Sequence, residues 1–439
     1  MKGLGLKKLF KNIAGTLGRQ VISGVVQLTT LAIIARVFGP SGNGVYTLAL
    51  LLPAMLATFL NLGVSPANVY FLGANKVAPK QAWKVTLKIS GRLSAIGLSI
   101  GGLIIYFKSS SFFPAVPIEI LWLSLLFFPL TLITANISGF FQGLQEFKQF
   151  NVVLLLQPLL NLIGVGTLLI VGYSDICYIL ICYFVSLIIT QYISFSLLQN
   201  LLDTRTGPNV NGYGKKLLNY GYKAHFSNIL AFINYRADIF ILGYFIGAAP
   251  VGIYAVAVTI TEKLWLLSNA ISTVLLPRLS ELSSEEDKRR VLTPLIARWV
   301  LWLTLFASLV LLLIGDIVIQ LIFGDEFKEA YLAIVYLVPG IVVGACSRVL
   351  ANDIAARGRP ELNLSTSWIT VIINIIANIL LIPQYGLQGA ALATSFAYIV
   401  NFLMRLTIHN YFTKVAFYKN IIIGIDDFNL IKSVMNKNK

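Results

Sequence analysis

The chain has 439 residues, of which 57% are hydrophobic and 12% are charged. A water-soluble domain of this length needs more polar surface, so the composition excludes a soluble globular protein and indicates that most of the chain lies in a membrane. The formal net charge of +16 falls in loops, with no basic run on a soluble domain, and this excludes a protein that binds nucleic acid.

Apolar stretches long enough to cross roughly 30 Å of hydrocarbon recur along the whole chain. They predict an all-α polytopic membrane protein with about twelve transmembrane helices. The predicted helices lie near residues 12–37, 43–72, 83–107, 117–142, 150–172, 175–198, 217–247, 249–276, 294–322, 328–352, 363–382 and 388–412.

Basic residues gather in alternate loops, and by the positive-inside rule these loops and both termini lie in the cytoplasm. The opposite loops have little beyond Arg36, Lys108 and Lys328. The three cysteines lie in apolar stretches without metal-ligand spacing, so we expect neither a metal nor a cofactor. The basic residues of the cytoplasmic loops are Lys76, Lys80, Lys84, Lys148, Arg205, Lys215, Lys216, Arg278, Lys288, Arg289, Arg290, Arg357 and Arg359.

An internal repeat divides the chain into two halves of six helices each. The pairs Phe38-Gly39 and Gly44-Val45-Tyr46 reappear as Ile246-Gly247 and Gly252-Ile253-Tyr254, at a constant offset of 208 residues. Because six is even, the two halves have the same orientation, and substrate should lie in a central cavity between the lobes. The predicted parts are an N-lobe (1–198), a linker (199–216), which is equally compatible with an ordinary loop, a C-lobe (217–412) and a cytoplasmic tail (413–439).

One face of the first predicted helix is polar. Its residues are spaced by three or four positions and include a single cation, Arg19, with Ser23 and Gln27 following on the same face. A helix in a membrane keeps such a stripe where it lines a wet cavity. We therefore expect Arg19, Ser23 and Gln27 to bind substrate, and we expect Arg19→Ala to reduce transport more than Arg19→Lys.

The second half has further polar groups at membrane depth, where charge is costly unless it faces water or a partner. A structural role is equally compatible for several of them. Lys223 and Lys263 lie close enough to helix ends to extend toward the interface. Arg236 and Asp238 face away from one another and have other helices as candidate partners. The candidates for substrate binding in this half are Tyr220, Lys223, Tyr235, Arg236, Lys263, Asn269 and Arg348, joined by Asn61 of the first half, which matches Asn269 in the repeat.

The sequence contains no phosphate-cradling loop, nucleophile elbow or histidine cluster, so we expect a protein that is not an enzyme. Without an ATP site, an ion gradient or the substrate gradient would supply the energy. Asp238, Glu262 and His225 are the titratable groups that could couple transport to protons.

The stretch from Ala35 to Tyr46, followed by Asn61-Leu62-Gly63-Val64, resembles the opening of the Wzx-type polysaccharide flippases of the multidrug/oligosaccharidyl-lipid/polysaccharide exporter superfamily. The resemblance implies two lobes around a cationic cavity in the bacterial inner membrane, which move an undecaprenyl-diphosphate-linked oligosaccharide by alternating access. The oligosaccharide would be an O-antigen unit or a capsule or exopolysaccharide unit. Arg19 with Lys223, Arg236 or Lys263 would hold the diphosphate. Membrane lipids are expected partners, and a polysaccharide polymerase and glycosyltransferases are candidate partners.

Three alternatives stay open. Drug and cation exporters of the same superfamily tend to place a carboxylate on the first helix, where this chain has Arg19. Flippases of the peptidoglycan lipid precursor usually have two more helices and an arginine after the Leu-Pro pair of the second helix, where this chain has Leu52-Pro53-Ala54. A membrane scaffold in polysaccharide assembly would need no polar stripe. The segment from Phe417 to Lys439 is too short in its apolar part to span a membrane and should lie at the cytoplasmic interface or be frayed.

Overall fold

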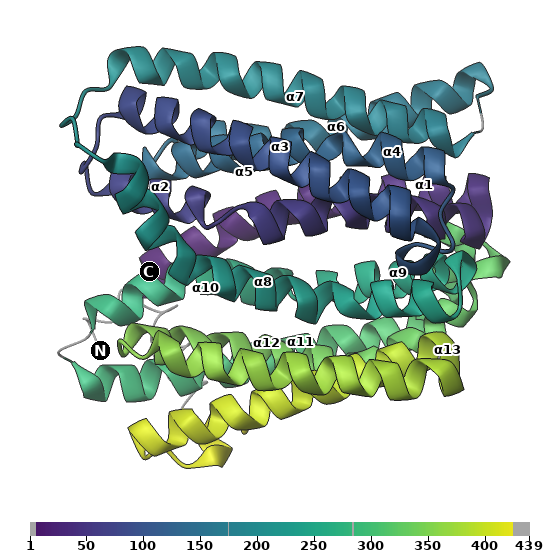
Figure 1. Ribbon diagram of the computed structural model, residues 1–439. Helices are drawn as coiled ribbons and strands as arrows, with labels where there is room; N and C mark the ends of the chain where they lie inside the picture. The colour runs from purple at the N-terminus through teal and green to yellow at the C-terminus, as the bar shows by residue number, and fades with distance from the viewer. Residues whose placement is uncertain (1–5, 174, 283–284, 425–439) are drawn as a thin grey trace. The chain divides into compact units, whose positions relative to one another are not determined.

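The structure is a computed structural model that describes residues 6–173, 175–282 and 285–424. Every regular element in those residues is a helix (Figure 1). Contacts divide the chain into two compact units, one of residues 25–255 and one of residues 256–424 with the start of the first helix up to Gly24. The two lobes predicted from the repeat, 1–198 and 217–412, stay a prediction.

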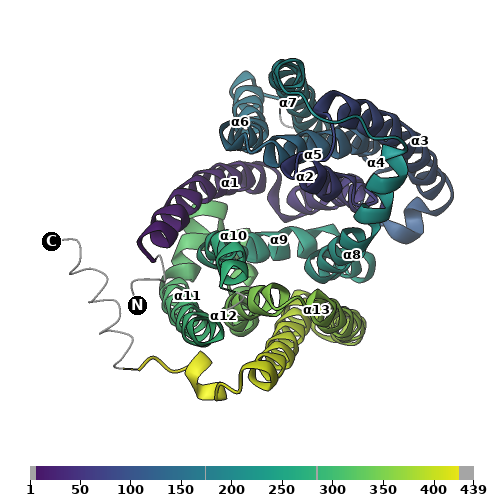
Figure 2. The same ribbon diagram turned by 90° about the vertical axis from the view of Figure 1, so that its left-hand side faces the viewer.

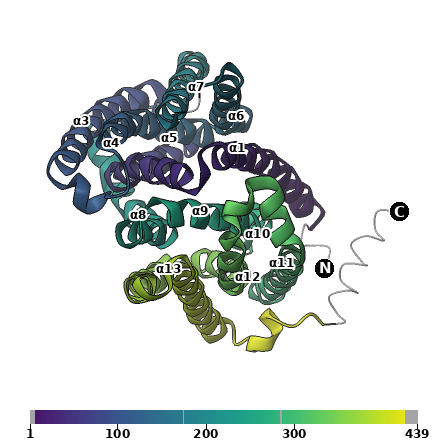
Figure 3. The ribbon, with the colours of Figure 1, turned by 90° about the vertical axis from the view of Figure 1, so that its right-hand side faces the viewer.

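The unit of residues 25–255 is a helical bundle in which α5 is the central element. This helix packs against α2, α3 and α7, and α6 packs along α7. Figure 3 shows α5 with α4, α6 and α7 beside it. The helices of this unit are α1 (Leu6–Leu60) from Val25 onward, α2 (Val64–Gly73), α3 (Pro79–Phe112), α4 (Ile118–Leu125), α5 (Phe127–Gly143), α6 (Phe147–Val171), α7 (Ile176–Thr204), α8 (Tyr213–Phe245) and the first half of α9 (Ala248–Lys263).

Glycines mark the same backbone break in both halves of the repeat. Gly39 inside α1 has φ 64° and Gly247 before α9 has φ 107°, a region that side chains with a Cβ rarely adopt. Just after each break the two repeats meet. A Cβ built on Gly44 would lie 1.8 Å from the carbonyl oxygen of Ala248, and one built on Gly252 would lie 2.0 Å from that of Pro40. The repeated glycines Gly44 and Gly252 thus form a reciprocal contact, in which each lies against the backbone of the other repeat.

Asn68 links the helices at one end of this bundle. Its Nδ2 donates to Thr86 Oγ1 of α3 at 2.9 Å, and its Oδ1 accepts from the hydroxyl of Tyr213 on α8 at the same distance. All of these groups are buried among aromatic side chains such as Phe140 and Trp83. A buried amide is tolerated there because both of its ends are hydrogen-bonded.

The second unit is built around α12, which packs against α10, α11 and α13. Figure 2 shows α12 between α11 and α13. The long helix α13 is broken at Gly386, which has φ 57°. The elements of this unit are the end of α9, α10 (Leu266–Glu281), α11 (Glu286–Phe323), η1 (Asp325–Phe327), α12 (Glu329–Ala356), α13 (Pro360–Thr413) and η2 (Phe417–Asn420).

The chain is a multi-pass membrane protein. Eight helices of the described residues are long and apolar enough to cross a membrane, and the bent pair α9 and α10 makes up to nine. The helices lie close to the predicted stretches, so the predicted all-helical membrane architecture is confirmed.

Some predicted boundaries are wrong. The helix expected at 43–72 is interrupted between Leu60 and Val64, and the one expected at 249–276 bends by 49° between α9 and α10. The interruptions fall at these points and at Gly39 and Gly386. The helices continue without interruption through Pro53, Pro158 and Pro339. Proline removes one hydrogen bond, and neighbouring groups can compensate within a membrane helix.

The two polar connections outside the helices are both docked. The linker expected at 199–216 shortens to 205–212, since α7 continues to Thr204. Gln81 of α3 exchanges two hydrogen bonds of 2.8 Å with the backbone of Val210 in this linker.

After α13 the chain lies on α11, where Arg298 Nη1 donates to the carbonyl of Lys419 and Trp302 Nε1 to that of Ile421, both at 2.7 Å. The described part of the tail is thus held by α11, and residues 425–439 lie outside the described residues.

Candidate functional site

The break between α1 and α2 lies directly against α8. A Cβ on Gly63 would lie 1.9 Å from the carbonyl oxygen of Gly221, so only glycine allows the two backbones to come this close. The contact places Asn61 of the break near Tyr220 and His225 of α8. Three predicted site residues, two for substrate and one for ion coupling, therefore come together in the unit of residues 25–255.

Two polar atoms in this region have no hydrogen-bond partner among the residues that the structure describes. They are Oδ1 of Asn61 and Nδ1 of His225. The imidazole is only 7% exposed and is hydrogen-bonded to the backbone of Phe59. Buried polar atoms are normally paired, so unpaired ones near a backbone break mark a place where a polar ligand or water can bind.

An aromatic pair extends the same region. The rings of Tyr220 and Tyr70 stack with their centroids 4.3 Å apart and an angle of 8° between the planes. Lys76 Nζ donates to the hydroxyl of Tyr70 at 2.6 Å. Both tyrosines are about 40% exposed. An exposed aromatic face beside polar groups offers an apolar surface on which a sugar ring can pack.

Asp238 is nearly fully buried at the other end of α8, with an exposed fraction of 3%. Its Oδ2 accepts a hydrogen bond from the hydroxyl of Tyr254 at 2.7 Å, and its Oδ1 accepts one from the amide of Ile239 at 2.8 Å. Arg236, two positions earlier, is half-buried and donates through Nη1 to the carbonyl of Tyr235 at 2.9 Å. The sequence thus located a buried carboxylate in a hydrogen-bonded setting.

In the second unit, Arg348 of α12 meets two residues at the bend between α9 and α10. Its guanidinium carbon lies 3.9 Å from the ring centroid of Trp265, and its Nη1 donates to Oδ1 of Asn269. The indole is fixed in turn, because its Nε1 donates to the carbonyl of Ile341 at 2.8 Å. Arg348 and Asn269, predicted from separate helices, are therefore neighbours, and the structure adds Trp265.

The other predicted residues are more scattered. The side chain of Lys263 packs on Gly24, its Cδ lying 3.5 Å from where a Cβ would be, while Glu262 and Ser23 are half-buried in the same unit. Gln27 is exposed in the unit of residues 25–255. The side chains of Arg19 and Lys223 lie outside the described residues.

A largely buried ionic cluster, not expected from the sequence, lies at the start of α11 and the ends of α12 and α13. Asp353 is its centre. Its Oδ2 accepts from Arg357 Nε at 2.6 Å, and its Oδ1 from Arg289 Nη2 at 3.4 Å and Thr293 Oγ1 at 3.2 Å. Arg357 also donates to both oxygens of Glu286, at 3.0 and 3.1 Å. We call these four charged residues together with His409 the ionic cluster.

One residue of the ionic cluster corrects an expectation: Arg289, assigned to a cytoplasmic loop, belongs to α11 and is 3% exposed. His409, near the end of α13, is fully buried. Burial alone would lower the pKa of Arg357, but hydrogen bonds and charge from Asp353 and Glu286 outweigh it and raise that pKa above its ordinary value. The one available signal was the spacing of Asp353 and Arg357, which puts them on one helical face.

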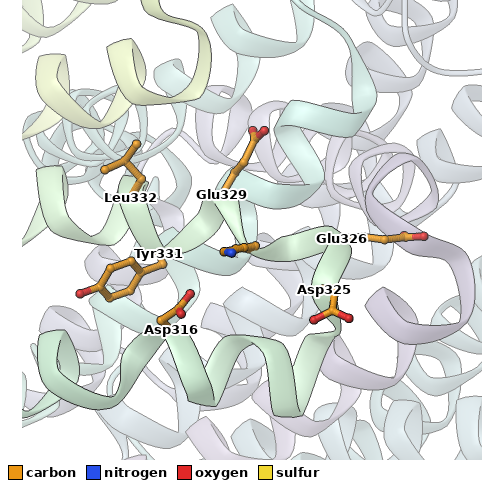
Figure 4. Close-up of a pocket in the computed structure, with 7 residues that line it drawn as sticks. Asp316, Asp325, Glu326, Glu329, Tyr331 and Leu332 are labelled. Atoms are coloured by element: carbon orange, nitrogen blue, oxygen red, sulfur yellow. The ribbon is translucent and has the colours of Figure 1, made fainter.

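A pocket of about 460 Å³ opens beside η1. Figure 4 shows Asp316 of α11 next to Tyr331 of α12, with Asp325 on η1. Within the described ranges, no group of three or more His, Cys, Asp or Glu side chains is arranged to hold a metal ion. The pocket is therefore an acidic surface feature, lined by Asp316, Asp325, Glu326, Lys328, Glu329, Tyr331 and Leu332.

Known proteins resemble this chain in sequence and fold. A family model described as "Polysaccharide biosynthesis protein" matches residues 33–332. The chain is 22% identical over 412 residues to the "Putative O-antigen transporter" of Shigella flexneri, which covers 90% of this chain and 96% of that protein. It is 25% identical over 210 residues to the "Probable low-salt glycan biosynthesis flippase Agl15" of Haloferax volcanii, covering 46% of this chain and 43% of that protein.

These likenesses differ in extent. The chain spans less than half the length of three of the curated relatives that it matches. A solved structure of "Lipid II flippase MurJ, inward closed conformation" superposes with a TM-score of 0.68 over 96% of this chain and 98% of that one, at 17% identity. At that identity the match shows a shared fold.

Proposed function

The chain belongs to the polysaccharide biosynthesis protein family, and from that premise we propose that it is a flippase for an undecaprenyl-diphosphate-linked oligosaccharide in the bacterial inner membrane. The observation that carries the proposal is the likeness to an O-antigen transporter, which extends over nearly the whole length of both chains. O-antigen or capsule repeat units are the proposed cargo, moved by alternating access without enzymatic chemistry.

We infer a topology of twelve spans with both termini in the cytoplasm. Helix α1 has 55 residues and α13 has 54, more than twice the length that crosses roughly 30 Å of hydrocarbon, and each is broken once at a glycine. The eight apolar helices give ten spans, because α1 and α13 each count twice. Helix α8 and the bent pair of α9 and α10 add one span each, which makes twelve. Helix α8 has 33 residues but is too polar to pass as an ordinary span, as expected for a helix that lines a cavity.

The diphosphate would be bound by cations at membrane depth. Arg348 is the candidate that we favour, because it is half-buried and two of its contacts are with groups that carry no charge, the amide of Asn269 and the ring of Trp265. Phosphate forms charge-assisted bonds with a guanidinium that are about twice as strong as neutral ones, so it can replace the amide. Further cations proposed from the sequence are Arg19, Lys223, Arg236 and Lys263.

The oligosaccharide would pack near the break between α1 and α2. The exposed face of Tyr220 and the unpaired Oδ1 of Asn61 provide an apolar surface and a hydrogen-bond acceptor for a sugar ring. Ser23, Gln27, Tyr235 and Asn269 are further proposed sugar contacts. Ion coupling is assigned to Asp238, Glu262 and His225, of which Asp238 is supported most strongly by its burial.

Reconstitution tests the proposal. The purified protein is placed in vesicles containing a fluorescent polyprenyl-diphosphate oligosaccharide, and a membrane-impermeant quencher reports how much of the lipid has reached the other leaflet. We expect faster translocation than in empty vesicles. Parallel vesicles contain the peptidoglycan lipid precursor or a cationic drug. Transport of only one of those would replace the proposal by the corresponding transporter, and transport of none would favour a scaffold.

A further inference from the structure

The ionic cluster joins three helices through unequal bonds to one carboxylate. Asp353 of α12 binds Arg357 of the same helix tightly at 2.6 Å, whereas Arg289 of α11 reaches it only at 3.4 Å. The Nε2 of His409 on α13 lies 3.5 Å from Asp353 Oδ2, too far for a good hydrogen bond. Arg289 is therefore the weakest-bound cation in the cluster. It connects α11 to α12 together with two stronger links, from Arg357 to Glu286 at 3.0 Å and from Thr293 to Asp353 at 3.2 Å.

The four charges that act on His409 cancel only while His409 is neutral. Glu286 is also paired with Arg290 on the exposed side of the cluster, at 3.2 Å. Glu286 and Asp353 carry two negative charges, and Arg289 and Arg357 carry two positive ones. These four groups, from α11 and α12, are the charged groups that act on His409 from the helices packed against it. A buried ionic group is tolerated when its charge is compensated and strongly disfavoured when it is not.

His409 has the capacity to disturb this balance. The ring is fully buried, and neither of its nitrogens has a hydrogen-bond partner in the structure. A proton on Nε2 would turn the 3.5 Å approach into an ion pair with Asp353 and would give the cluster a net positive charge. That excess is relieved by releasing the most weakly held cation.

We propose that the ionic cluster is a proton-operated clasp, in which a proton on His409 takes over Asp353, releases Arg289 and loosens the start of α11 on α12. The pair of Arg357 and Glu286 is then the ionic link that remains between the two helices. His409 is protonated in the open clasp and neutral in the closed clasp, so the clasp is closed at higher pH and a falling pH favours opening. The clasp would link protons to helix movement, and this role rests on the proposed transport function. The residues of the clasp are different from those assigned to ion coupling above.

Distances between spin labels test the clasp. The three native cysteines are replaced by alanine, and labels are attached at Val291 on α11 and Tyr411 on α13, which are both well exposed. In lipid nanodiscs, the labelled protein that has no other substitution should show a single, shorter distance between the two labels at pH 7.5. At pH 5.5 a longer distance should appear, with the ratio of long to short raised by about tenfold or more.

Two histidine variants locate the proton. His409→Gln should keep the shorter distance at both pH values. The chain has two histidines, so His225→Gln is the matched control and should keep the wild-type pH dependence. Arg289→Gln should show the longer distance already at pH 7.5, and it keeps the test decisive if His409→Gln does not fold. A wild-type distance that does not change with pH would overturn the clasp, as would a His409→Gln protein that responds as the wild type does. Because the readout is a distance, it is independent of whether the reconstituted protein moves the proposed lipid.

Discussion

Replacing Gly252 by alanine should force α9 away from the neighbouring turn of α1. The new Cβ would lie 2.0 Å from the carbonyl oxygen of Pro40, whereas an ordinary contact of this kind is about 3.3 Å. The two backbones would have to separate by roughly 1.3 Å. No rotation of a side chain can relieve the clash, because the obstacle is backbone.

The separation would also break a buried hydrogen bond. Asn43, which is fully buried, donates from Nδ2 to the carbonyl of Gly252 at 2.9 Å. Overpacking of a close contact costs about 1–3 kcal/mol and the lost bond about 1 kcal/mol. We therefore expect the free energy of unfolding to fall by about 2–4 kcal/mol.

Thermal unfolding of the purified protein in detergent, followed by tryptophan fluorescence, measures this change. Gly44→Ala tests the reciprocal contact and should lower Tm by a similar amount. Gly166→Ala in α6 is the matched control, because no atom lies within 4 Å of the site and alanine favours a helix by up to about 1 kcal/mol. If Gly252→Ala unfolds at the same temperature as Gly166→Ala, the reciprocal backbone contact is refuted.

Three further predictions concern other parts of the molecule. Arg348→Ala should slow translocation of the lipid-linked oligosaccharide by about tenfold to a hundredfold in the vesicle assay, and Arg348→Lys by less, since a charge-assisted bond contributes about 1.5–3 kcal/mol; equal rates for the two variants would contradict a role for the positive charge. Asp238→Asn should lower the free energy of unfolding by about 1 kcal/mol, because the amide oxygen can still accept from Tyr254 but the NH2 group cannot accept from the amide of Ile239. The dependence of transport on an ion gradient should be lost, and an unchanged dependence would remove Asp238 from the coupling site. A chain ending at Ala416 should have a free energy of unfolding about 2 kcal/mol lower than that of a chain ending at Gly424, because the two bonds from α11 to the tail are lost. Identical values of Tm for the two chains would show that the docked tail adds no stability.

Hydrophobic patterning predicted the helices well because membrane insertion depends on local composition. A stretch of apolar residues must satisfy its own backbone hydrogen bonds in lipid, so it becomes a helix wherever it lies in the chain. The predicted stretch 83–107 lies inside α3, which extends from Pro79 to Phe112. The extra turns are polar ends that continue beyond the apolar part, and hydropathy does not register them.

The sequence predicted which residues belong to the candidate site, but it did not predict that they lie close together. The three residues were chosen on separate grounds: Asn61 from its match to Asn269 in the repeat, Tyr220 as a polar group at membrane depth, and His225 as a titratable group. Their proximity depends on the close backbone approach of Gly63 and Gly221, two residues that lie far apart in the sequence. Nothing in a sequence of one chain specifies which of many glycines will touch.

The repeat and the apolar stretches were determined by the sequence alone, because periodicity and composition are properties of neighbouring residues. The partners of the buried charges were decided by the tertiary structure. Arg289 was assigned to a cytoplasmic loop, and His409 lies near the end of its helix, yet both pack on Asp353. Whether a charge near a helix end faces water or a countercharge depends on which other helix end lies beside it. Packing of helices that are distant in the sequence sets that neighbour, and local hydropathy does not.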